Sequence, residues 1–278
     1  MRILLIDVPY DCGQLNTRMG AGPSFLVERG IAKSLRAAGH DVRRESVRLT
    51  DRFHTEWNAL VALQRQIAAH VRTAARAGER AIVLSGNCGP AALGVLGGLG
   101  GRETATVWMD AHADFNTPET SPSGFLDGMA AAIAVGHCWR GVTAAFEHFE
   151  PMPEDQLVQF GVRSVDPGER DRLARSRVHS AGNDTHRVAA LSEQLSGRVR
   201  QLYVHVDLDV IDDGELRANL YATSGGPGAT QVVEAVRAAA SGIRLSAASI
   251  TALDPSVDPE RSWTVSERVA HALADDSG

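Results

Sequence analysis

The chain has 278 residues, of which 44% are hydrophobic and 22% charged, a composition typical of a globular protein that excludes a disordered one. Its 28 Lys and Arg residues against 34 Asp and Glu residues give a net charge of −6, which argues against a nucleic-acid partner, and no apolar run is long enough to span a membrane. Three widely spaced cysteines and an N-terminus without the features of a signal peptide indicate a reducing compartment, so we expect a cytoplasmic protein.

Short apolar segments alternate with amphipathic ones along the chain. Residues 3–8 form a continuous apolar run that predicts a strand buried on both faces, while 23–38, with Gly39 just after it, predicts a helix. We expect Gly97, Gly98, Gly100 and Gly101 to form a turn. Further strands are predicted at 81–84, 106–109, 157–160, 202–206 and 246–250, and further helices at 59–77, 90–96, 230–240 and 263–274.

This alternation predicts one α/β domain over residues 1–278, with a mainly parallel sheet and helices on both of its faces. In such a sheet, the loops that follow the carboxyl ends of the strands form the binding site. The longest turn-rich segments, 118–124 and 212–228, follow predicted strands, so we expect both to border a site.

Acidic residues and one histidine directly follow two of the predicted strands. Asp110, His112 and Asp114 alternate after one strand, so their side chains can project toward one locus. Asp207 and Asp209 follow the other strand in the same way. Because Asp is rarely buried unless it is paired or binds a metal, two divalent cations would neutralise four carboxylates gathered at one sheet edge. The alternative is that one pair is merely solvated.

The run at 110–118, Asp-Ala-His-Ala-Asp-Phe-Asn-Thr-Pro, resembles the manganese signature of the ureohydrolases, the family of arginases and agmatinases. Val-Asp-Leu-Asp at 206–209 resembles the second signature of that family, and 161–169 is similar to a substrate-contacting segment of arginases. The resemblance implies a three-layer α/β fold with a mainly parallel eight-stranded sheet. It also implies two Mn²⁺ ions bridged by a hydroxide that attacks a planar amidino carbon, a small-molecule substrate, and possible assembly into a homo-oligomer.

The resemblance further implies which residues bind the two metals. Asp110 and Asp207 would bridge the ions, and Asp114 would bind one of them. His112 and Asp209 would bind the other ion.

The first metal-binding motif of the family is Gly-Gly-Asp-His-Ser, and residues 85–89 here are Ser-Gly-Asn-Cys-Gly. Cys88 therefore stands at the position of a ligand histidine, as in some Nω-hydroxyarginine amidinohydrolases. Because thiolate is a softer ligand than imidazole, Zn, Fe or Co becomes an alternative to Mn. The other interpretations are that Cys88 does not bind and one metal position is loose or empty, or that Cys88 is a buried structural residue.

Asp114, Asp127 and His205 are the candidate catalytic residues. Asp127 stands where arginases have a histidine used for proton transfer, and it is either a proton shuttle or a solvated loop carboxylate. His205 comes two residues before Asp207 and is either a hydrogen-bonding partner of a metal ligand or a packed core residue.

The two ends of the expected substrate site differ in how well they match arginases. The positions whose arginase counterparts touch the α-carboxylate and α-amino groups are kept here: Asn116, Ser123, Asp166 and Glu169. Ala252, in contrast, replaces a glutamate that pairs with the guanidinium group. Asp254 either substitutes for that glutamate or shapes the turn before Pro255.

These departures favour an amino-acid substrate whose amidino group is less basic than that of arginine. We hypothesise a metal-dependent hydrolase that cleaves the amidino C–N bond of Nω-hydroxyarginine or another modified arginine and releases urea or hydroxyurea. One alternative is a catalytically silent scaffold or regulatory subunit. Another is a single-metal amidohydrolase in which Cys88 lies outside the coordination shell.

Overall fold

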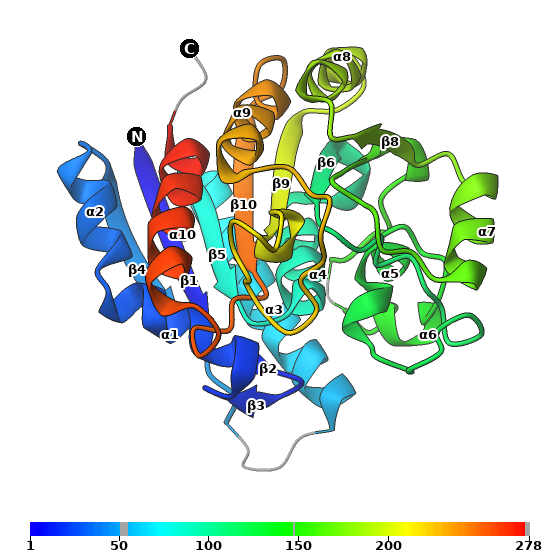
Figure 1. Cartoon of the computed structure of the whole chain (residues 1–278), viewed down its shortest axis with the longest axis horizontal. Helices are drawn as coiled ribbons and strands as arrows, with labels where there is room; N and C mark the ends of the chain where they lie inside the picture. Colours follow the sequence, from blue (N-terminus) through cyan, green and yellow to red (C-terminus); the bar gives the residue numbers. More distant parts are fainter. Residues whose placement is uncertain (51–54, 147, 276–278) are drawn as a thin grey trace.

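A parallel sheet of eight strands runs through the computed structural model, which describes residues 1–50, 55–146 and 148–275 (Figure 1). All neighbouring strands in this sheet are parallel, which confirms the predicted α/β class. The strand order is β4 (Asp41–Ser46), β1 (Arg2–Val8), β5 (Arg80–Ser85), β10 (Leu245–Thr251), β9 (Gln201–Asp207), β6 (Thr104–Met109), β7 (Leu157–Phe160) and β8 (His179–Gly182). A separate hairpin is formed by β2 (Tyr10–Asp11) and β3 (Gln14–Leu15).

Helices cover both faces of the sheet and complete three layers (Figure 1). The α-helices are α1 (Ala21–Glu28), α2 (Ile31–Ala37), α3 (Glu56–Arg76), α4 (Cys88–Leu99), α5 (Ala130–Ala134), α6 (Arg140–Thr143), α7 (Pro167–Arg175), α8 (Thr185–Ser196), α9 (Ala229–Ala239) and α10 (Pro259–Ala274). Short 3-10 turns are η1 (Arg18–Gly20), η2 (Gly101–Glu103), η3 (Asp127–Met129), η4 (Glu154–Gln156) and η5 (Leu208–Val210).

Each face of the sheet has its own hydrophobic core. One core contains Leu26 of α1, Leu35 of α2, Val236 of α9 and Val269 of α10, together with strand residues such as Leu5. In α9 and α10 the buried side chains recur at helical spacing, so each of these helices turns an apolar stripe toward the sheet. Burial of this apolar surface is the main favourable contribution to the stability of the layer.

The opposite core lies beneath α3, α4 and α5 and contains Leu63, Ile67, Leu93 and Ile133. α3 and α4 lie close together because α4 presents glycines to α3: a Cβ on Gly94 would lie 2.6 Å from the Cβ of Ile67. Glycine therefore lets these two helix backbones approach.

Two predictions about chain breaks were wrong. Gly97 and Gly98 do not form a turn but lie in the last turn of α4, where they face α3. Gly100, with φ +91°, ends that helix. The single helix predicted at 23–38 is two helices, because Gly30 adopts φ +94° between α1 and α2. An interior glycine can serve packing or chain reversal, and spacing alone does not distinguish these uses.

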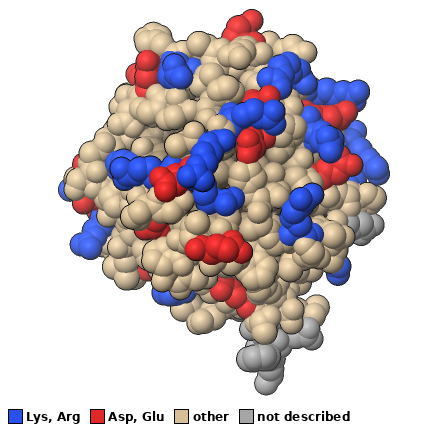
Figure 2. Space-filling model, turned by 90° about the vertical axis from the view of Figure 1, so that its right-hand side faces the viewer, with Lys and Arg blue, Asp and Glu red and all other residues tan. Residues whose placement is uncertain are grey.

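The surface carries charges of both signs. On the face in Figure 2, which is the right-hand side of Figure 1, Lys and Arg side chains lie intermixed with Asp and Glu. Within the described ranges, no helix combines the length and the apolar character required to cross a bilayer. The three cysteines are free, and Cys88 and Cys138 are buried.

Candidate metal centre and active site

The polar residues of the expected site meet in one cavity at the carboxyl ends of neighbouring strands. The cavity has a volume of about 290 Å³. Among the candidate site residues, only His205 does not line it. The candidates that do are Cys88, Asp110, His112, Asp114, Asn116, Ser123, Asp127, Asp166, Glu169, Asp207 and Asp209. The strand-end positions of the signatures therefore converge as expected for an open parallel sheet.

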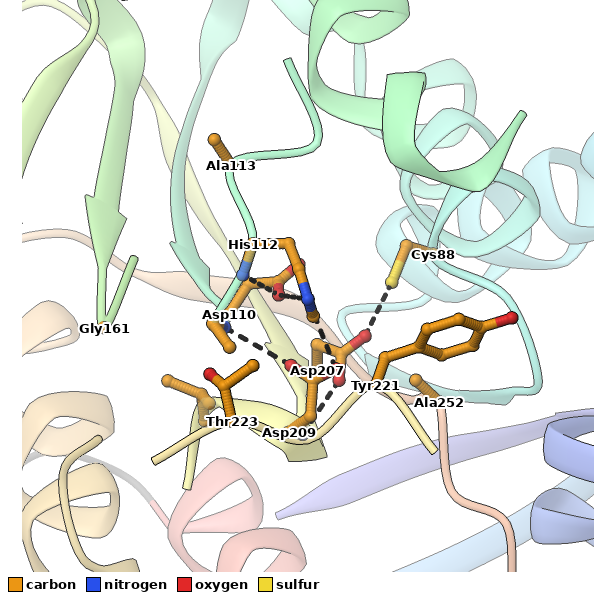
Figure 3. Close-up of polar contacts among 12 residues, drawn as sticks. Cys88, Asp110, His112, Ala113, Gly161, Asp207, Asp209, Tyr221, Thr223 and Ala252 are labelled. Atoms are coloured by element: carbon orange, nitrogen blue, oxygen red, sulfur yellow. Dashed lines mark hydrogen bonds and ion pairs between the residues drawn. The ribbon is translucent and has the colours of Figure 1, made fainter. Parts of the chain in front are cut away.

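One group of potential metal ligands consists of Asp110, His112 and Asp209, whose donor atoms all lie within 4.8 Å of one another (Figure 3). His112 Nδ1 is 3.4 Å from Asp110 Oδ1 and 3.4 Å from Asp209 Oδ2. Burial lowers the pKa of His112, but hydrogen bonds to the two carboxylates outweigh that effect and raise it to about 12. Two carboxylates thus face one imidazole, an arrangement that suits a divalent cation in place of the imidazole proton.

A second group consists of Cys88, Asp110 and His205, again within 4.8 Å of one another. The Cys88 thiol donates a hydrogen bond of 3.1 Å to Asp207 Oδ2 (Figure 3). Burial, reinforced by the nearby carboxylates, raises the pKa of the thiol well above its usual value, so a thiolate here requires a cation. Asp110 belongs to both groups, which is what a carboxylate shared by two metals requires.

The electrostatics of the cavity also suit two cations. Burial, followed by repulsion from neighbouring carboxylates, raises the pKa values of Asp110, Asp114 and Asp207. No Lys or Arg of the described residues lines the cavity to offset these charges. The donor set therefore fits a dinuclear divalent metal site. Two expected ligands, Asp207 and Asp114, the latter with φ +50°, belong to neither three-donor group among the residues that the structure describes.

Asp127 holds the first turn of α4. Its Oδ2 accepts hydrogen bonds from Cys88 N at 2.9 Å and Asn87 Nδ2 at 3.0 Å, and its Oδ1 accepts one from Gly89 N at 2.7 Å. Burial raises its pKa to about 7, although these three hydrogen bonds lower it. Asp127 therefore lines the cavity and accepts three hydrogen bonds. It is not the solvated loop carboxylate that was one of its two interpretations.

The residues expected to contact the substrate head group form one wall of the cavity. Asn116 Nδ2 donates to Asp166 Oδ2 at 2.9 Å, and Ser123 is exposed at the mouth, where its Oγ accepts from Phe125 N at 3.1 Å. Both carboxylate oxygens of Glu169 accept backbone amides, from Phe115 at 2.6 Å and from Asp166 at 3.1 Å. Glu169 thus fixes the start of α7 and the loop after β6 relative to each other.

The opposite wall contains Ala252, which adopts φ +59° directly after β10. Asp254 does not line the cavity, and its Oδ1 accepts from Ser256 N and Ser256 Oγ at 3.0 and 2.6 Å. This pattern is that of a turn and not of a replacement for the lost glutamate.

Two aromatic residues at the cavity were not predicted. Tyr221 and Phe125 both line it, and their rings stack with centroids 5.8 Å apart. Figure 3 shows Tyr221 on the side of the site where Ala252 lies. Both residues lie in or beside segments expected to border the site, 118–124 and 212–228, but no local pattern indicated which side chains would reach inward.

Arg163 was also missed. Its guanidinium donates to the carbonyl oxygens of Asp209, Val210 and Thr223 at 3.0, 3.0 and 2.8 Å. It therefore fixes the η5 turn, which carries Asp209, to the loop that leads away from it. No sequence signal distinguishes a partly buried arginine that binds carbonyl groups from a surface arginine.

The eight-stranded parallel sheet, with two overlapping groups of potential metal ligands at the carboxyl ends of its strands, places the chain in the class of three-layer α/β proteins with a carboxylate-rich site. A model of the arginase family matches residues 1–276, and the chain belongs to that family, whose members hydrolyse C–N bonds in linear amidines. This result confirms the resemblance to the ureohydrolases.

Individual relatives agree with the family assignment. The chain is 28% identical to an arginase of Neurospora crassa over 75% of its length and 66% of that protein. It is 31% identical to arginase-1 of Xenopus laevis over 75% of its length and 72% of that protein. The structure of arginase from Bacillus caldovelox is similar with a TM-score of 0.85, 26% identity and coverage of 98% of this chain and 97% of that one.

Proposed function

We propose that the protein hydrolyses the amidino C–N bond of an arginine-like amino acid, with Nω-hydroxyarginine as the favoured substrate, and releases urea or hydroxyurea. The observation that carries the proposal is the contrast within one cavity. The carboxylate-rich donor groups around Asp110 remain, whereas the wall at Ala252 offers no carboxylate to a guanidinium ion. Relatives named arginase support an amidino substrate.

The metals would be held by the six candidate ligands: Cys88, Asp110, His112, Asp114, Asp207 and Asp209. When bound, a pair of divalent cations supplies an acidified water as nucleophile at neutral pH. Mn²⁺ is usual for the family, and the Cys88 thiolate would favour Zn, Fe or Co.

Asp127 would hold the proton that the leaving amine requires. Its Oδ2 already accepts two hydrogen bonds and its Oδ1 only one, so the free lone pair lies on Oδ1. A pKa raised to about 7 by burial allows this carboxyl group to gain and lose a proton near neutral pH.

Neutral donors would receive the α-carboxylate of the substrate, and a carboxylate would receive its α-amino group. Asn116 and Ser123 carry an amide and a hydroxyl at the cavity wall, and Asp166 carries the negative charge beside them. Tyr221 and Phe125 would cover the aliphatic chain and exclude water.

An N-hydroxyguanidine is less basic than a guanidine, so it is neutral more often and loses less when no carboxylate faces it. Ala252 is buried at the cavity wall and contributes only a methyl group there. The proposed preference for Nω-hydroxyarginine over arginine therefore follows from the absence of a carboxylate at position 252.

The test combines metal content with a substrate screen. The purified protein is loaded with Mn²⁺, freed of excess metal and assayed for urea or hydroxyurea release from arginine, Nω-hydroxyarginine and agmatine. We expect about two metals per chain, fewer in Cys88→Ala, and no change in the control Cys138→Ala, which removes a buried thiol away from the cavity.

Other outcomes would contradict the proposal in distinct ways. Arginine as the best substrate by a wide margin would overturn the preference for a modified arginine. One metal per chain, unchanged in Cys88→Ala, would favour a single-metal amidohydrolase. No metal and no activity would favour a silent scaffold.

A further inference from the structure

His205 lies in the central strand β9, fully buried and two residues before Asp207. It pairs with Trp108 of β6 on one side and with Ser249 of β10 on the other, so these side chains share one face of the sheet. That face is the one covered by α4, whose first residue is Cys88. The imidazole therefore lies directly below the site.

The two ring nitrogens of His205 have different surroundings. Nδ1 lies 2.8 Å from Tyr203 Oη and 2.8 Å from Ser249 Oγ, and these hydroxyls are 2.7 Å from each other. Among the described residues, Nε2 has a single hydrogen-bond contact, to Thr251 Oγ1 at 3.5 Å. The same Thr251 Oγ1 lies 3.3 Å from Cys88 Sγ, so Nε2 is on the side of the imidazole where the Cys88 thiol lies.

This arrangement is typical of a metal-binding histidine, whose second ring nitrogen is usually fixed by a hydrogen bond to a neighbouring group. Trp108 adds to the fixation, because its ring stacks on the His205 ring with centroids 3.9 Å apart. The same indole donates from Nε1 to Asp110 Oδ2 at 3.0 Å. One side chain thus orients two of the three members of the Cys88, Asp110 and His205 group.

We propose that His205 binds, through Nε2, the metal ion that Cys88 also binds, and so restores an imidazole to the position where Cys88 has replaced one. The inference rests on the proposed function, because it concerns one of the two metals assumed there. The donor atoms of the three residues all lie within 4.8 Å of one another, so they can converge on one ion with bonds of about 2.0–2.3 Å.

The proposal assigns different chemistry to the two metal positions. The position with Cys88 and His205 has sulfur, nitrogen and oxygen donors, which favour Zn, Fe or Co. The position with His112 and Asp209 keeps mainly oxygen donors, which suit Mn. Asp110 belongs to both groups and would join them.

The test loads the full-length protein with Co²⁺ and reads the ligands without any substrate. Proton NMR of the cobalt protein detects the N–H of a ligating imidazole as a paramagnetically shifted resonance. The N–H at Nδ1 of His205 is buried against Tyr203 and Ser249, so its signal should survive in water. We expect His205→Phe, which keeps an aromatic ring against Trp108, to lose this signal. Its Co²⁺ affinity should fall by more than the roughly 10–100-fold typical of losing an orienting partner.

Ser249→Ala keeps the proposal testable if His205→Phe does not fold. It removes one partner of Nδ1 and leaves the ligand, so the affinity should fall by roughly 10–100-fold while the shifted resonance remains at a new position. Unchanged affinity and an unchanged spectrum in His205→Phe would overturn the inference, even in a protein that hydrolyses Nω-hydroxyarginine. A wild-type protein that binds cobalt through His205 and hydrolyses no amidine would overturn only the proposed function.

Discussion

Asp127 Oδ1 accepts a hydrogen bond of 2.7 Å from the backbone amide of Gly89, in the first turn of α4. Oδ2 of the same carboxylate accepts one from the amide of Cys88, which is 39 positions earlier in the chain. The loop after β6 therefore fixes the end of the helix that carries the thiol. The location of Cys88 in the site depends on this carboxylate as well as on α4 itself.

Removal of this carboxylate should destabilise the protein. Asp127→Ala leaves the amides of Cys88 and Gly89 without an acceptor, and we expect the free energy of unfolding to fall by about 2–4 kcal/mol. Asp127→Asn keeps one acceptor oxygen and should lose about half as much. Urea denaturation of the metal-free protein measures both values. A loss of less than about 0.5 kcal/mol in Asp127→Ala, the usual range for a surface substitution, would show that water replaces the carboxylate.

The stability of the metal-free protein should fall as the pH rises from about 4 to 7. Burial raises the pKa of Asp110 from 3.8 to about 6 and that of Asp127 from 3.8 to about 7, so the folded state holds more protons than the unfolded state in this range. Each group adds stability that is complete below its unfolded pKa and is lost as the pH rises through its folded pKa, by up to about 1.4 kcal/mol per pH unit. The pKa values of Asp114 and Asp207 are also raised.

His205 and Asp209 oppose this trend. Burial lowers the pKa of His205 to about 3. Burial raises the pKa of Asp209, but its interactions with His112 outweigh that effect and lower it. Both residues favour the folded state as the pH rises, but the four carboxyl groups with raised pKa values outweigh them. Urea denaturation with a chelator across this pH range gives the curve. Excess Mn²⁺ should reverse its slope, because metal ligands bind in their deprotonated forms. A metal-free protein that gains stability from about pH 4 to 7 would contradict the raised pKa values.

Restoring a carboxylate at Ala252 should change the substrate preference. We expect Ala252→Glu to raise kcat/KM for arginine relative to Nω-hydroxyarginine by about tenfold, which corresponds to about 1.4 kcal/mol of preferential binding of the charged guanidinium. Ala252 already has φ +59°, so the substitution adds no new left-handed backbone. Ala252→Gln has a similar size without the charge and serves as the control. An equal change in both variants would assign the effect to shape.

Arg163 should affect metal affinity without touching the metal. Arg163→Lys replaces a planar group that binds several carbonyl oxygens, including that of Asp209, by a single ammonium group. We expect the affinity for Mn²⁺ to fall by roughly 10–100-fold, measured by titration calorimetry. Arg102, whose ion pair with Glu150 is exposed on both sides, provides the control Arg102→Lys, which should bind Mn²⁺ as the wild type does. Equal affinities in the two variants would contradict a positioning role for Arg163.

The buried strands could be predicted from the sequence because they are continuous apolar runs, as in β1 and β5. The edge strand β4 was missed because it alternates buried and exposed residues and carries charged side chains such as Arg43 and Glu45. α7 was missed for a related reason, since Glu169 is its only buried residue and no apolar stripe marks it. Segments at the margin of the sheet bury too little apolar surface to leave a pattern.

The candidate metal ligands could be predicted because their residue types and spacing at strand ends carry the chemistry. Asp110 and Asp209 are the main examples. Tyr221 and Arg163 could not be predicted, because loops bring them to the site and neither has a periodic neighbour in the sequence. The hydrogen bonds of Asp127 to α4 likewise depend on tertiary structure alone.

The glycines of α4 pack closely against α3, so side chains on α3 affect the position of the helix that begins at Cys88, one of the proposed metal ligands. A Cβ at Gly94 would collide with Ile67, and one at Gly98 would lie 2.6 Å from the Cβ of Val71, so α4 has no free space on that side. Metal–ligand bonds tolerate errors of only about 0.2 Å. In the proposed metal site, a larger side chain on α3 would displace α4, which begins at Cys88, and so would change the distance from the sulfur to the metal. Natural variation or engineering at Ile67 and Val71 offers a way to adjust metal selectivity while every ligand stays the same.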